Sequence, residues 1–439
     1  MENCDIIIIG AGAAGLMAAS ASAGEGRNVI VLEKMHRPGR KLMITGKGRC
    51  NFTNLKPWND FCRHIHPKSD FLKPAFYNLS SEKTIDFLSR YGLESTTERG
   101  DRVFPVSHLA SDVVDTLVSA AESAGARILC GKTVKEISSA ANDGRTEFTI
   151  SCEDSSSYKC NRLIICTGGL SYPKTGSTGD GYRFAKAFGH EIRQTFPSLT
   201  AIVPAVYKSG AAPGTEKGHI DRNTPLSETG KALCGNHLKN IQLTIIIDGN
   251  QAQSEFGDMD FTDGGIEGPV GFKVSRKCVK ALINGSRITA SIDLKPAVGQ
   301  EELEVRISAL WNEVAKDRRN GSRPYKERFR ILLTKVLPMS LIAGFTRLNP
   351  DIDHRTLAKA LKNWKFEIAG YVGYERSVVT AGGIACEEVI SKTMESRLMP
   401  GIYFAGEILD LDADTGGYNI QTAFSTGWLA GINAAKSIR

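Results

Sequence analysis

Residues 4–15 of the chain read CDIIIIGAGAAG, and this short stretch decides the fold of the first part of the protein. The apolar run Cys4–Ile9 predicts a buried strand, and the Ala-rich segment that follows predicts a helix. Between them, Gly10 permits a tight strand-to-helix turn, Gly12 lets the backbone approach a pyrophosphate, and Gly15 lets the helix pack on the strand. The free N–H groups at the start of such a helix bind phosphates.

A second apolar strand, Val29–Leu32, ends at Glu33. An acidic side chain about twenty residues after the glycines is placed to accept hydrogen bonds from ribose hydroxyls. It also repels a 2′-phosphate, so NADP is disfavoured at this site. A glycine-rich turn that arose by chance is the alternative, but the strand–turn–helix–strand–acid order favours an ADP-containing dinucleotide.

Composition excludes several other classes of protein. The chain has 439 residues, of which 41% are hydrophobic and 23% charged, as expected for two or three globular domains. No apolar segment has the length of a membrane span, and Ile6–Ile9 is too short for a signal peptide. The ten cysteines include no CxxC pair, which argues against a dithiol oxidoreductase and favours a reduced, cytoplasmic protein. No spacing of residues indicates a metal site.

The net charge of +7 is modest, and its densest basic piece starts at Lys316-Asp317-Arg318-Arg319 and continues to Arg330. A solvated helical face explains this run. The more specific alternative is that the run binds an anionic substrate or a nucleic acid, although no nucleic-acid motif supports the latter.

The texture of the sequence changes twice. We expect a discontinuous nucleotide-binding domain from residues 1–195 and 356–439. We expect an inserted mixed β/α domain at 196–355, with a polar loop at Ser209–Ser227 and helices around Trp311 and Leu332 near 300–355. Within the first part, Phe148–Ile150 and Lys159–Leu163 predict a hairpin that crosses a polar turn near Asn142-Asp143-Gly144.

The C-terminal part has the same order of elements as the N-terminal part: a buried strand, a glycine-containing turn and a helix. A buried strand, Gly401–Ala405, runs into Gly406-Glu407, and Gly417-Tyr418-Asn419 precede a final small-residue helix. The helix start offers a second site for negative charge. Two such sites bracket one elongated ligand, which resembles the layout of FAD enzymes with the glutathione-reductase-type nucleotide-binding fold.

The resemblance becomes specific at Gly39–Leu42 and Thr45–Asn54, which read GRKL and TGKGRCNFTN. These segments are similar to the hallmark of a bacterial flavoprotein family, the BaiN/RdsA-like or aminoacetone-oxidase-like FAD-binding enzymes. Further matching segments are Thr167–Pro173, Gly176–Gly181, Thr262–Pro269, Tyr403–Glu407 and Gly416–Gln421. The chain departs from the family pattern at Asp263, Glu267 and Ala413.

The resemblance implies an α/β architecture: a Rossmann-like FAD-binding domain, an inserted β-barrel-like domain and a small helical subdomain. By this analogy Glu33 holds the adenosine ribose, Arg40 and Lys41 lie near the ribose and pyrophosphate, Val134 faces the adenine, and Asn419 and Gln421 bind flavin carbonyls. The predicted FAD-binding residues are Gly10, Gly12, Ala13, Ala14, Gly15, Glu33, Lys34, Arg40, Lys41, Thr45, Gly46, Val134, Thr167, Gly168, Gly406, Glu407, Gly417, Tyr418, Asn419, Ile420 and Gln421.

Arg49, Cys50 and Asn51 are the candidate catalytic residues, because the resemblance places their loop against the isoalloxazine. Arg49 would stabilise an anionic reduced ring or a substrate carboxylate. Cys50 would be reactive if Arg49 lowered the pKa of its thiol. The alternative is that the loop only packs on the ring. His64 and His66 are interpreted as ordinary surface or core residues.

The expected activity is that of an FAD-dependent oxidoreductase that exchanges a hydride between flavin N5 and a small organic substrate. The chain has one Gly-x-Gly-x-x-Gly motif, so we expect either NAD(P)H that docks transiently or dioxygen as the electron partner. The alternatives are a flavin-dependent nucleic-acid-modifying enzyme and a non-catalytic flavin-binding protein. The sequence leaves the substrate and the oligomeric state open.

Overall fold

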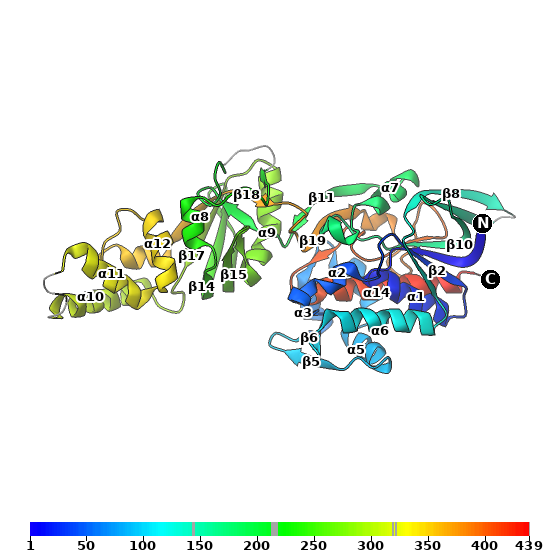
Figure 1. Cartoon of the computed structure of the whole chain (residues 1–439), viewed down its shortest axis with the longest axis horizontal. Coiled ribbons are helices and arrows are strands. Elements are labelled where there is room, and N and C mark those ends of the chain that lie inside the picture. Colours follow the sequence, from blue (N-terminus) through cyan, green and yellow to red (C-terminus); the bar gives the residue numbers. More distant parts are fainter. Residues whose placement is uncertain (143–144, 212–217, 318–319, 321–322, 439) are drawn as a thin grey trace. The chain divides into compact units, whose positions relative to one another are not determined.

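The computed structural model describes residues 1–142, 145–211, 218–317, 320 and 323–438. The chain divides into two compact units (Figure 1). Unit 1 comprises Met1–Phe196 and Val378–Arg439, and unit 2 comprises Pro197–Ser377. Both chain termini belong to unit 1, so unit 2 is an insertion.

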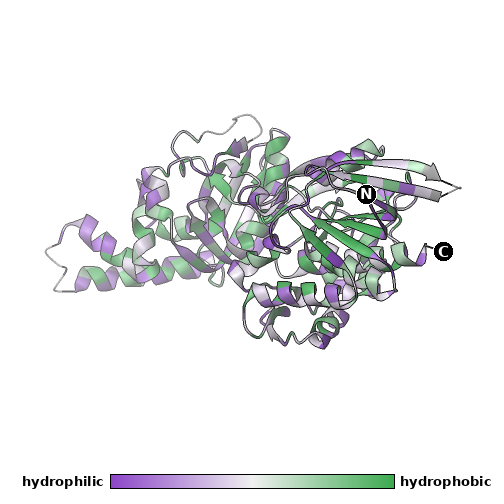
Figure 2. Cartoon of the chain, turned by 45° about the vertical axis from the view of Figure 1, so that its right-hand side comes forward, coloured by the Kyte–Doolittle hydropathy of each residue, from purple (hydrophilic) through white to green (hydrophobic). Residues whose placement is uncertain are grey.

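Unit 1 is built on a seven-stranded sheet whose strand order is β7-β2-β1-β10-β9-β8, with β20 also paired to β10. β7, β2, β1, β10 and β20 are parallel, whereas β9 and β8 continue the sheet in antiparallel fashion. Ile6–Ile9 are fully or almost fully buried, because helices and strands cover both faces of a parallel sheet. Figure 2 shows these apolar strands in green. The strands are β1 (Glu2–Ile9), β2 (Val29–Glu33), β7 (Arg127–Cys130), β8 (Val134–Asn142), β9 (Arg145–Cys152), β10 (Ser157–Ile165) and β20 (Ile402–Phe404).

The helices α1 (Ala13–Gly24) and α14 (Tyr418–Lys436) pack directly against each other in unit 1. A Cβ added at Gly427 would lie 2.2 Å from the carbonyl oxygen of Ala14, and one added at Gly431 would lie 2.4 Å from that of Ala18. The small residues of both helices therefore permit backbone-to-backbone contact, which explains why α1 is so rich in alanine. The first and last helices of unit 1 thus form one layer.

Smaller elements complete unit 1. Three short sheets join segments that are distant in sequence: β3 with β6 and β5, β4 with β21, and β11 with β19. Their bounds are β3 (Thr53–Asn54), β4 (Ile65–His66), β5 (Ser95–Glu98), β6 (Arg102–Pro105), β11 (Ile192–Ser198), β19 (Val379–Ile384) and β21 (Asp412–Ala413); the remaining helices are α2 (Arg40–Met43), α3 (Trp58–Phe61), α4 (Ser69–Asn78), α5 (Ser81–Arg90), α6 (Ala110–Ser123) and α7 (Asp180–Ala187).

Unit 2 contains a closed barrel, as the resemblance implied. The strand order is β12-β16-β15-β14-β17-β18, and β18 pairs with β12 to close the ring, while β13 pairs with Tyr371 and Val372 at the end of β18. Closure removes the exposed edges that an open sheet would have. The strands are β12 (Ile202–Pro204), β13 (His219–Ile220), β14 (His237–Ile247), β15 (Asn250–Thr262), β16 (Gly265–Glu267), β17 (Ile288–Asp293) and β18 (Trp364–Val372).

The predicted helices around Trp311 and Leu332 are present as α10 and α11, and they form a helical part of unit 2 together with α12 (Figure 1). Their buried residues join the same apolar core as the barrel. The helices are α8 (Glu228–Leu233), α9 (Gly268–Ile283), α10 (Gln300–Lys316), α11 (Tyr325–Val336), α12 (Met339–Leu348) and α13 (Leu357–Lys362). None of the helices described here is long and apolar enough to cross a membrane.

The sequence placed the return to the first domain at residue 356, but in the structure it falls at Val378. The reason is that β18 pairs with β12, β13 and β17 and so belongs to the barrel. The predicted hairpin of β9 and β10 is present, with Tyr158 opposite Ile150, but its turn lies at residues 153–156 and not near Asn142–Gly144. The predicted turn at Asn142–Gly144, the loop at Ser209–Ser227 and the basic run Lys316–Arg319 each extend into residues that are not described (143–144, 212–217 and 318–319).

Candidate cofactor site

The turn between β1 and α1 has the geometry that its three glycines predict. Gly10 has φ +98, and a Cβ there would lie 2.6 Å from the carbonyl oxygen of Cys166. A Cβ on Gly15 would lie 1.8 Å from the carbonyl oxygen of Gly10. At Gly12, by contrast, a Cβ would meet nothing within 4 Å. Two glycines are therefore needed by the fold itself, whereas the space at Gly12 remains open to a ligand.

Glu33 is held against this turn. Its two carboxylate oxygens accept hydrogen bonds from the backbone N–H groups of Ala11 and Met35, each at 2.8 Å. A carboxylate has about four acceptor positions, so both oxygens keep capacity for hydroxyl donors. The segment that leads to Val134 lies alongside, because the Lys132 N–H donates to the Glu33 carbonyl at 2.9 Å. The acid, the turn and the segment predicted to meet adenine thus share one edge of the sheet.

The C-terminal part of unit 1 reaches the same edge through β20 and Gly406. Gly406 has φ +79, and a Cβ there would lie 2.9 Å from the Cβ of Ala14 in the first turn of α1. Thr167 and Gly168 follow β10 directly, and Gly168 has φ +72. The structure therefore brings together the predicted phosphate turn and Gly406-Glu407, which are separated by most of the sequence.

The carboxylate of Glu407 accepts hydrogen bonds from other groups of the protein. Its carboxylate accepts from Lys41 Nζ at 2.7 and 3.0 Å, from the Ser171 hydroxyl at 2.6 Å and from the Thr380 N–H at 2.9 Å. Lys41 Nζ also donates to Ser171 Oγ at 2.5 Å. Sequence reasoning missed Ser171 and Thr380 in this network, because nothing in their local sequence indicates a shared partner.

The start of α14 forms the other end of the site. Gly417 has φ +96, and a Cβ there would lie 2.4 Å from the Thr53 carbonyl oxygen and 2.5 Å from Asn51 Oδ1. The Asn54 amide donates to the Gly416 carbonyl at 3.0 Å. Asn51 Oδ1 is buried and has no hydrogen-bond partner among the described residues. A buried acceptor without a partner is costly unless a ligand satisfies it.

Asn419 and Gln421, which the sequence predicts to bind flavin carbonyls, have side chains that bond to other parts of the protein. The Asn419 amide bonds both the N–H and the carbonyl of Ala413, at 2.8 and 2.7 Å. The fully buried Gln421 amide accepts from Thr53 Oγ1 at 2.5 Å and donates at 2.9–3.0 Å to Leu79, Thr84 and Ser425. Both side chains are thus used to fix the loops around the start of α14.

The two candidates for reactive chemistry, Arg49 and Cys50, are also placed differently from the expectation. The Arg49 guanidinium pairs with Glu98, contacts His108 Nδ1 at 2.9 Å and lies 4.5 Å from the ring centre of Phe104. Cys50 is fully buried, and this burial raises the pKa of its thiol to about 11 despite a hydrogen bond with Thr45. Arg49 does not activate Cys50 as a thiolate, so Asn51 is the member of the trio whose side chain remains available.

The remaining predicted residues line the same edge or flank it. Lys34 forms an ion pair with Asp180 at 2.6 Å and donates to Thr178 at 2.5 Å. Thr45 donates to the Leu42 carbonyl at 2.6 Å. Arg40 and Gly46 are exposed, whereas Ala14, Val134 and Tyr418 are buried and Ala13 and Ile420 are half-buried.

Sequence reasoning also missed a cluster formed by His64, His66 and Asp414. His64 Nδ1 and His66 Nε2 contact separate oxygens of Asp414 at 2.8 and 3.2 Å. Burial alone would raise the pKa of Asp414, but the hydrogen bonds from both histidines hold it at about 2. The three residues meet because β4 pairs with β21, a contact with no sequence signal. Within the described residues, no group of three such side chains could hold a metal ion.

Comparison with known proteins identifies the family of the chain. Residues 4–433 match the family model described as the HI0933-like protein Rossmann domain. The chain belongs to this family.

Three curated relatives match the chain over almost its full length. A ribosomal RNA dihydrouridine synthase of Escherichia coli (strain K12) is 29% identical, with 100% of both chains covered. A ribosomal RNA dihydrouridine synthase of Haemophilus influenzae is also 29% identical, with 98% of both covered. A 3-dehydro-bile acid delta(4,6)-reductase of Clostridium scindens is 28% identical, with 98% of both covered.

FAD is the cofactor of this flavoprotein, and the residues present fit it. The open space at Gly12 beside the α1 N-terminus suits the pyrophosphate, and Glu33 suits the adenosine ribose. The unpartnered Asn51 Oδ1 beside Gly417 suits the flavin end. The protein is therefore an FAD-dependent oxidoreductase.

Proposed function

We propose that the protein is a reductase that adds a hydride and a proton from solvent across a carbon–carbon double bond conjugated to a carbonyl, and that its substrate is a uridine of ribosomal RNA. The observation that carries the proposal is the α14 N-terminus, where Gly417 packs on Thr53 beside the unpartnered Asn51 Oδ1. Bound FAD, once reduced by an electron donor, would supply the two electrons as a hydride.

The protein residues around the start of α14 hold the loops that meet there and stabilise negative charge near Gly417. The N-terminus of this 19-residue helix carries a partial positive charge and favours negative charge near Gly417. The Thr53–Gln421 hydrogen bond and the Asn419 contacts with Ala413 hold the two loops that meet there. Asn51 Oδ1 accepts a hydrogen bond from the bound ligand. Because Arg49 is paired with Glu98, it fixes the loop and adds little net positive charge.

The names of the relatives support the substrate class. The formation of dihydrouridine reduces a pyrimidine double bond conjugated to a carbonyl, and a reductase of an unsaturated 3-keto bile acid acts on the same kind of bond. Two observations favour RNA over a steroid. The relatives include two ribosomal RNA dihydrouridine synthases, and residues 323–348 of unit 2 carry six Lys or Arg and one Glu. This substrate and the ten unpaired cysteines both suit the reducing cytoplasm.

We propose NADH or NADPH as the electron donor, docking transiently rather than in a dedicated domain. Anaerobic stopped-flow spectroscopy of the purified holoprotein tests the donor. Loss of the oxidised flavin absorbance on mixing with either nucleotide is expected, and failure with both nucleotides would contradict this donor. Reoxidation by dioxygen alone, measured in parallel, gives the background rate.

The substrate is tested by mixing the reduced holoprotein with ribosomal RNA transcribed in vitro, which contains no dihydrouridine. The expected result is flavin reoxidation faster than with a conjugated keto-steroid, together with a mass gain of two hydrogens on one uridine. Faster reoxidation by the steroid, with the RNA unchanged in mass, would reject RNA and leave the reductase chemistry in place.

A further inference from the structure

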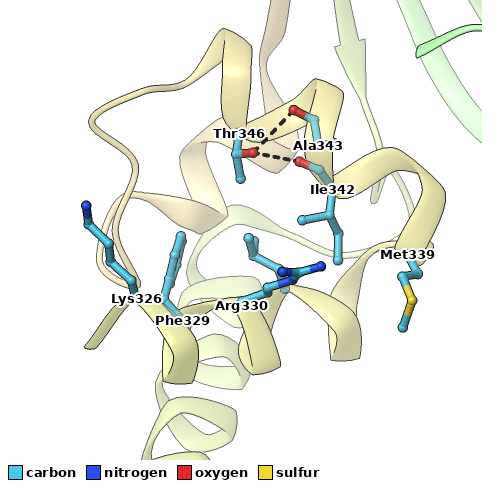
Figure 3. Close-up of a pocket in the computed structure, with 8 residues that line it drawn as sticks. Lys326, Phe329, Arg330, Met339, Ile342, Ala343 and Thr346 are labelled. Atoms are coloured by element: carbon cyan, nitrogen blue, oxygen red, sulfur yellow. Dashed lines mark hydrogen bonds between the residues drawn. The ribbon is translucent and has the colours of Figure 1, made fainter. Parts of the chain in front are cut away.

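A hollow lies between α11 and α12 in the helical part of unit 2 (Figure 3). Its volume is about 340 Å³, at the lower end of the range for small-ligand sites. α11 lines it with Lys326, Phe329, Arg330 and Leu333. These positions follow the i, i+3, i+4, i+7 spacing that places side chains on one face of a helix.

α12 contributes the opposite wall through Met339, Ile342 and Ala343, again from one helical face. Met339 is 74% exposed, whereas Ile342 is 8% exposed and belongs to the apolar core. The hollow therefore has a fixed apolar floor and an exposed apolar rim.

The charges at the hollow are of one sign. Lys326 and Arg330 are exposed, and neither forms an ion pair within the described part of the chain. No Asp or Glu lines the hollow. Neighbouring cations are neutralised: Arg323 pairs with Glu327 at 3.1 Å, and Lys335 with Glu313 at 3.6 Å. Among the side chains that line the hollow, the two cations are therefore not neutralised by a carboxylate.

We propose that this hollow binds single-stranded RNA, with a base seated against its apolar floor and backbone phosphates paired with Lys326 and Arg330. A nucleotide combines a flat apolar face with an adjacent negative charge, which is what the hollow and its two cations complement. The proposal rests on the proposed function, since it gives the RNA substrate a contact in unit 2. The role of the hollow is substrate binding and not chemistry.

The test measures RNA binding by the oxidised holoprotein without turnover. A short fluorescein-labelled oligouridine and a ribosomal RNA transcript are titrated by fluorescence anisotropy and gel shift. The K326E/R330E variant is expected to bind both at least tenfold more weakly at low salt. Its affinity should also depend less on salt, with the slope reduced by about 1.4, because each lost phosphate contact on a single strand contributes about 0.7.

A matched control separates the hollow from bulk charge. Lys239 and Lys280 are exposed cations elsewhere on unit 2, in β14 and α9. The K239E/K280E variant changes the net charge by the same amount, and it should bind RNA within twofold of the unchanged protein. Equal loss in both double variants, or no loss in either, would overturn the proposal, as would binding to phosphatidylserine vesicles but not to RNA.

Two further measurements keep the result interpretable. Flavin absorbance and the thermal unfolding midpoint report whether each variant is folded. If K326E/R330E does not fold, the milder K326A/R330A and the rim variant M339E should show the same loss of RNA binding. Flavin reduction by NAD(P)H is measured separately. Normal flavin reduction together with unchanged RNA affinity of the K326E/R330E variant would reject only the docking site. RNA binding at the hollow without flavin reduction would reject only the proposed activity.

Discussion

Lys41 and Glu407 lie 366 residues apart in the sequence and form an ion pair at 2.7 Å in unit 1. Both side chains are about one-fifth exposed, and Ser171 and Thr380 complete the network around the carboxylate. The contact links the helix that follows the first nucleotide-binding strands to the segment that follows β20. It therefore fastens the two parts of the cofactor site to each other.

Breaking this pair from one side should be costly. Glu407→Gln leaves the Lys41 ammonium partly buried without its counter-charge, and we expect a loss of about 1–3 kcal/mol in the free energy of unfolding. FAD should also dissociate faster. Urea unfolding and ultrafiltration of released flavin measure the two effects. A double-mutant cycle with Lys41→Met isolates the pair, and additive effects would show that the two residues do not interact.

Gly12→Ala should separate cofactor binding from folding. Gly12 has φ −84 and ψ −168, a backbone conformation open to any residue, and its Cβ would meet no protein atom within 4 Å. We expect nearly unchanged stability of the apoprotein but at least tenfold weaker FAD binding, because the methyl group enters the space left for the pyrophosphate. Calorimetric titration with FAD checks this.

Gly15→Ala is the matched comparison for that variant. Its Cβ would lie 1.8 Å from the Gly10 carbonyl oxygen, so it should destabilise the fold whether or not FAD is present. If Gly12→Ala and Gly15→Ala lowered stability equally, the space at Gly12 would have no special relation to the ligand.

Cys50 should behave as an inert core residue. Burial raises the pKa of its thiol to about 11, so almost no thiolate forms near neutral pH, and iodoacetamide should label Cys50 far more slowly than the exposed Cys130. Above the unfolded-state pKa of 9.0, the unfolded thiol ionises while the folded one does not, so stability falls as the pH rises from about 9 to 11. Cys50→Ser with lost flavin reduction, despite retained FAD, would contradict this view.

Asp414 should contribute stability with the opposite pH dependence. Its folded pKa of about 2 lies below the ordinary value of 3.8. The contribution, about 2 kcal/mol, is therefore present at neutral pH and is lost as the pH falls from about 4 to 2. Asp414→Asn should reduce the free energy of unfolding at pH 7, and the difference should shrink in acid. Asp60→Asn, which removes an exposed contact with Arg63, should change little at either pH.

Local signals predicted the parts of the site whose function depends on the backbone. Gly10, Gly15 and Gly417 were recognisable because close approach and positive φ require glycine, and Glu33 because a fixed distance along a strand–helix–strand unit determines where it lies. Side-chain roles were less predictable. Gln421 is predicted to bind a flavin carbonyl, and its side-chain partners Thr53, Thr84 and Ser425 were not predicted. The contacts with Thr53 and Thr84 span more than 300 residues of sequence, so no local pattern predicts them.

The same limit explains the boundary of unit 2. The segment 364–372 has the alternation of a strand, but alternation does not say which sheet the strand joins. Its pairing with β12 and β17 closes the barrel, so the return to unit 1 falls later than composition suggested.

The contact between α1 and α14 has a consequence for how the protein is made. The ribosome synthesises α1 early and α14 only after all of unit 2, yet Ala14 and Gly427 pack backbone to backbone. During translation unit 2 can close its barrel while unit 1 still lacks one of its helices and Gly417. FAD can then bind fully only after α14 has been synthesised. A nascent chain stalled before residue 418 would have a folded unit 2 and an incomplete unit 1.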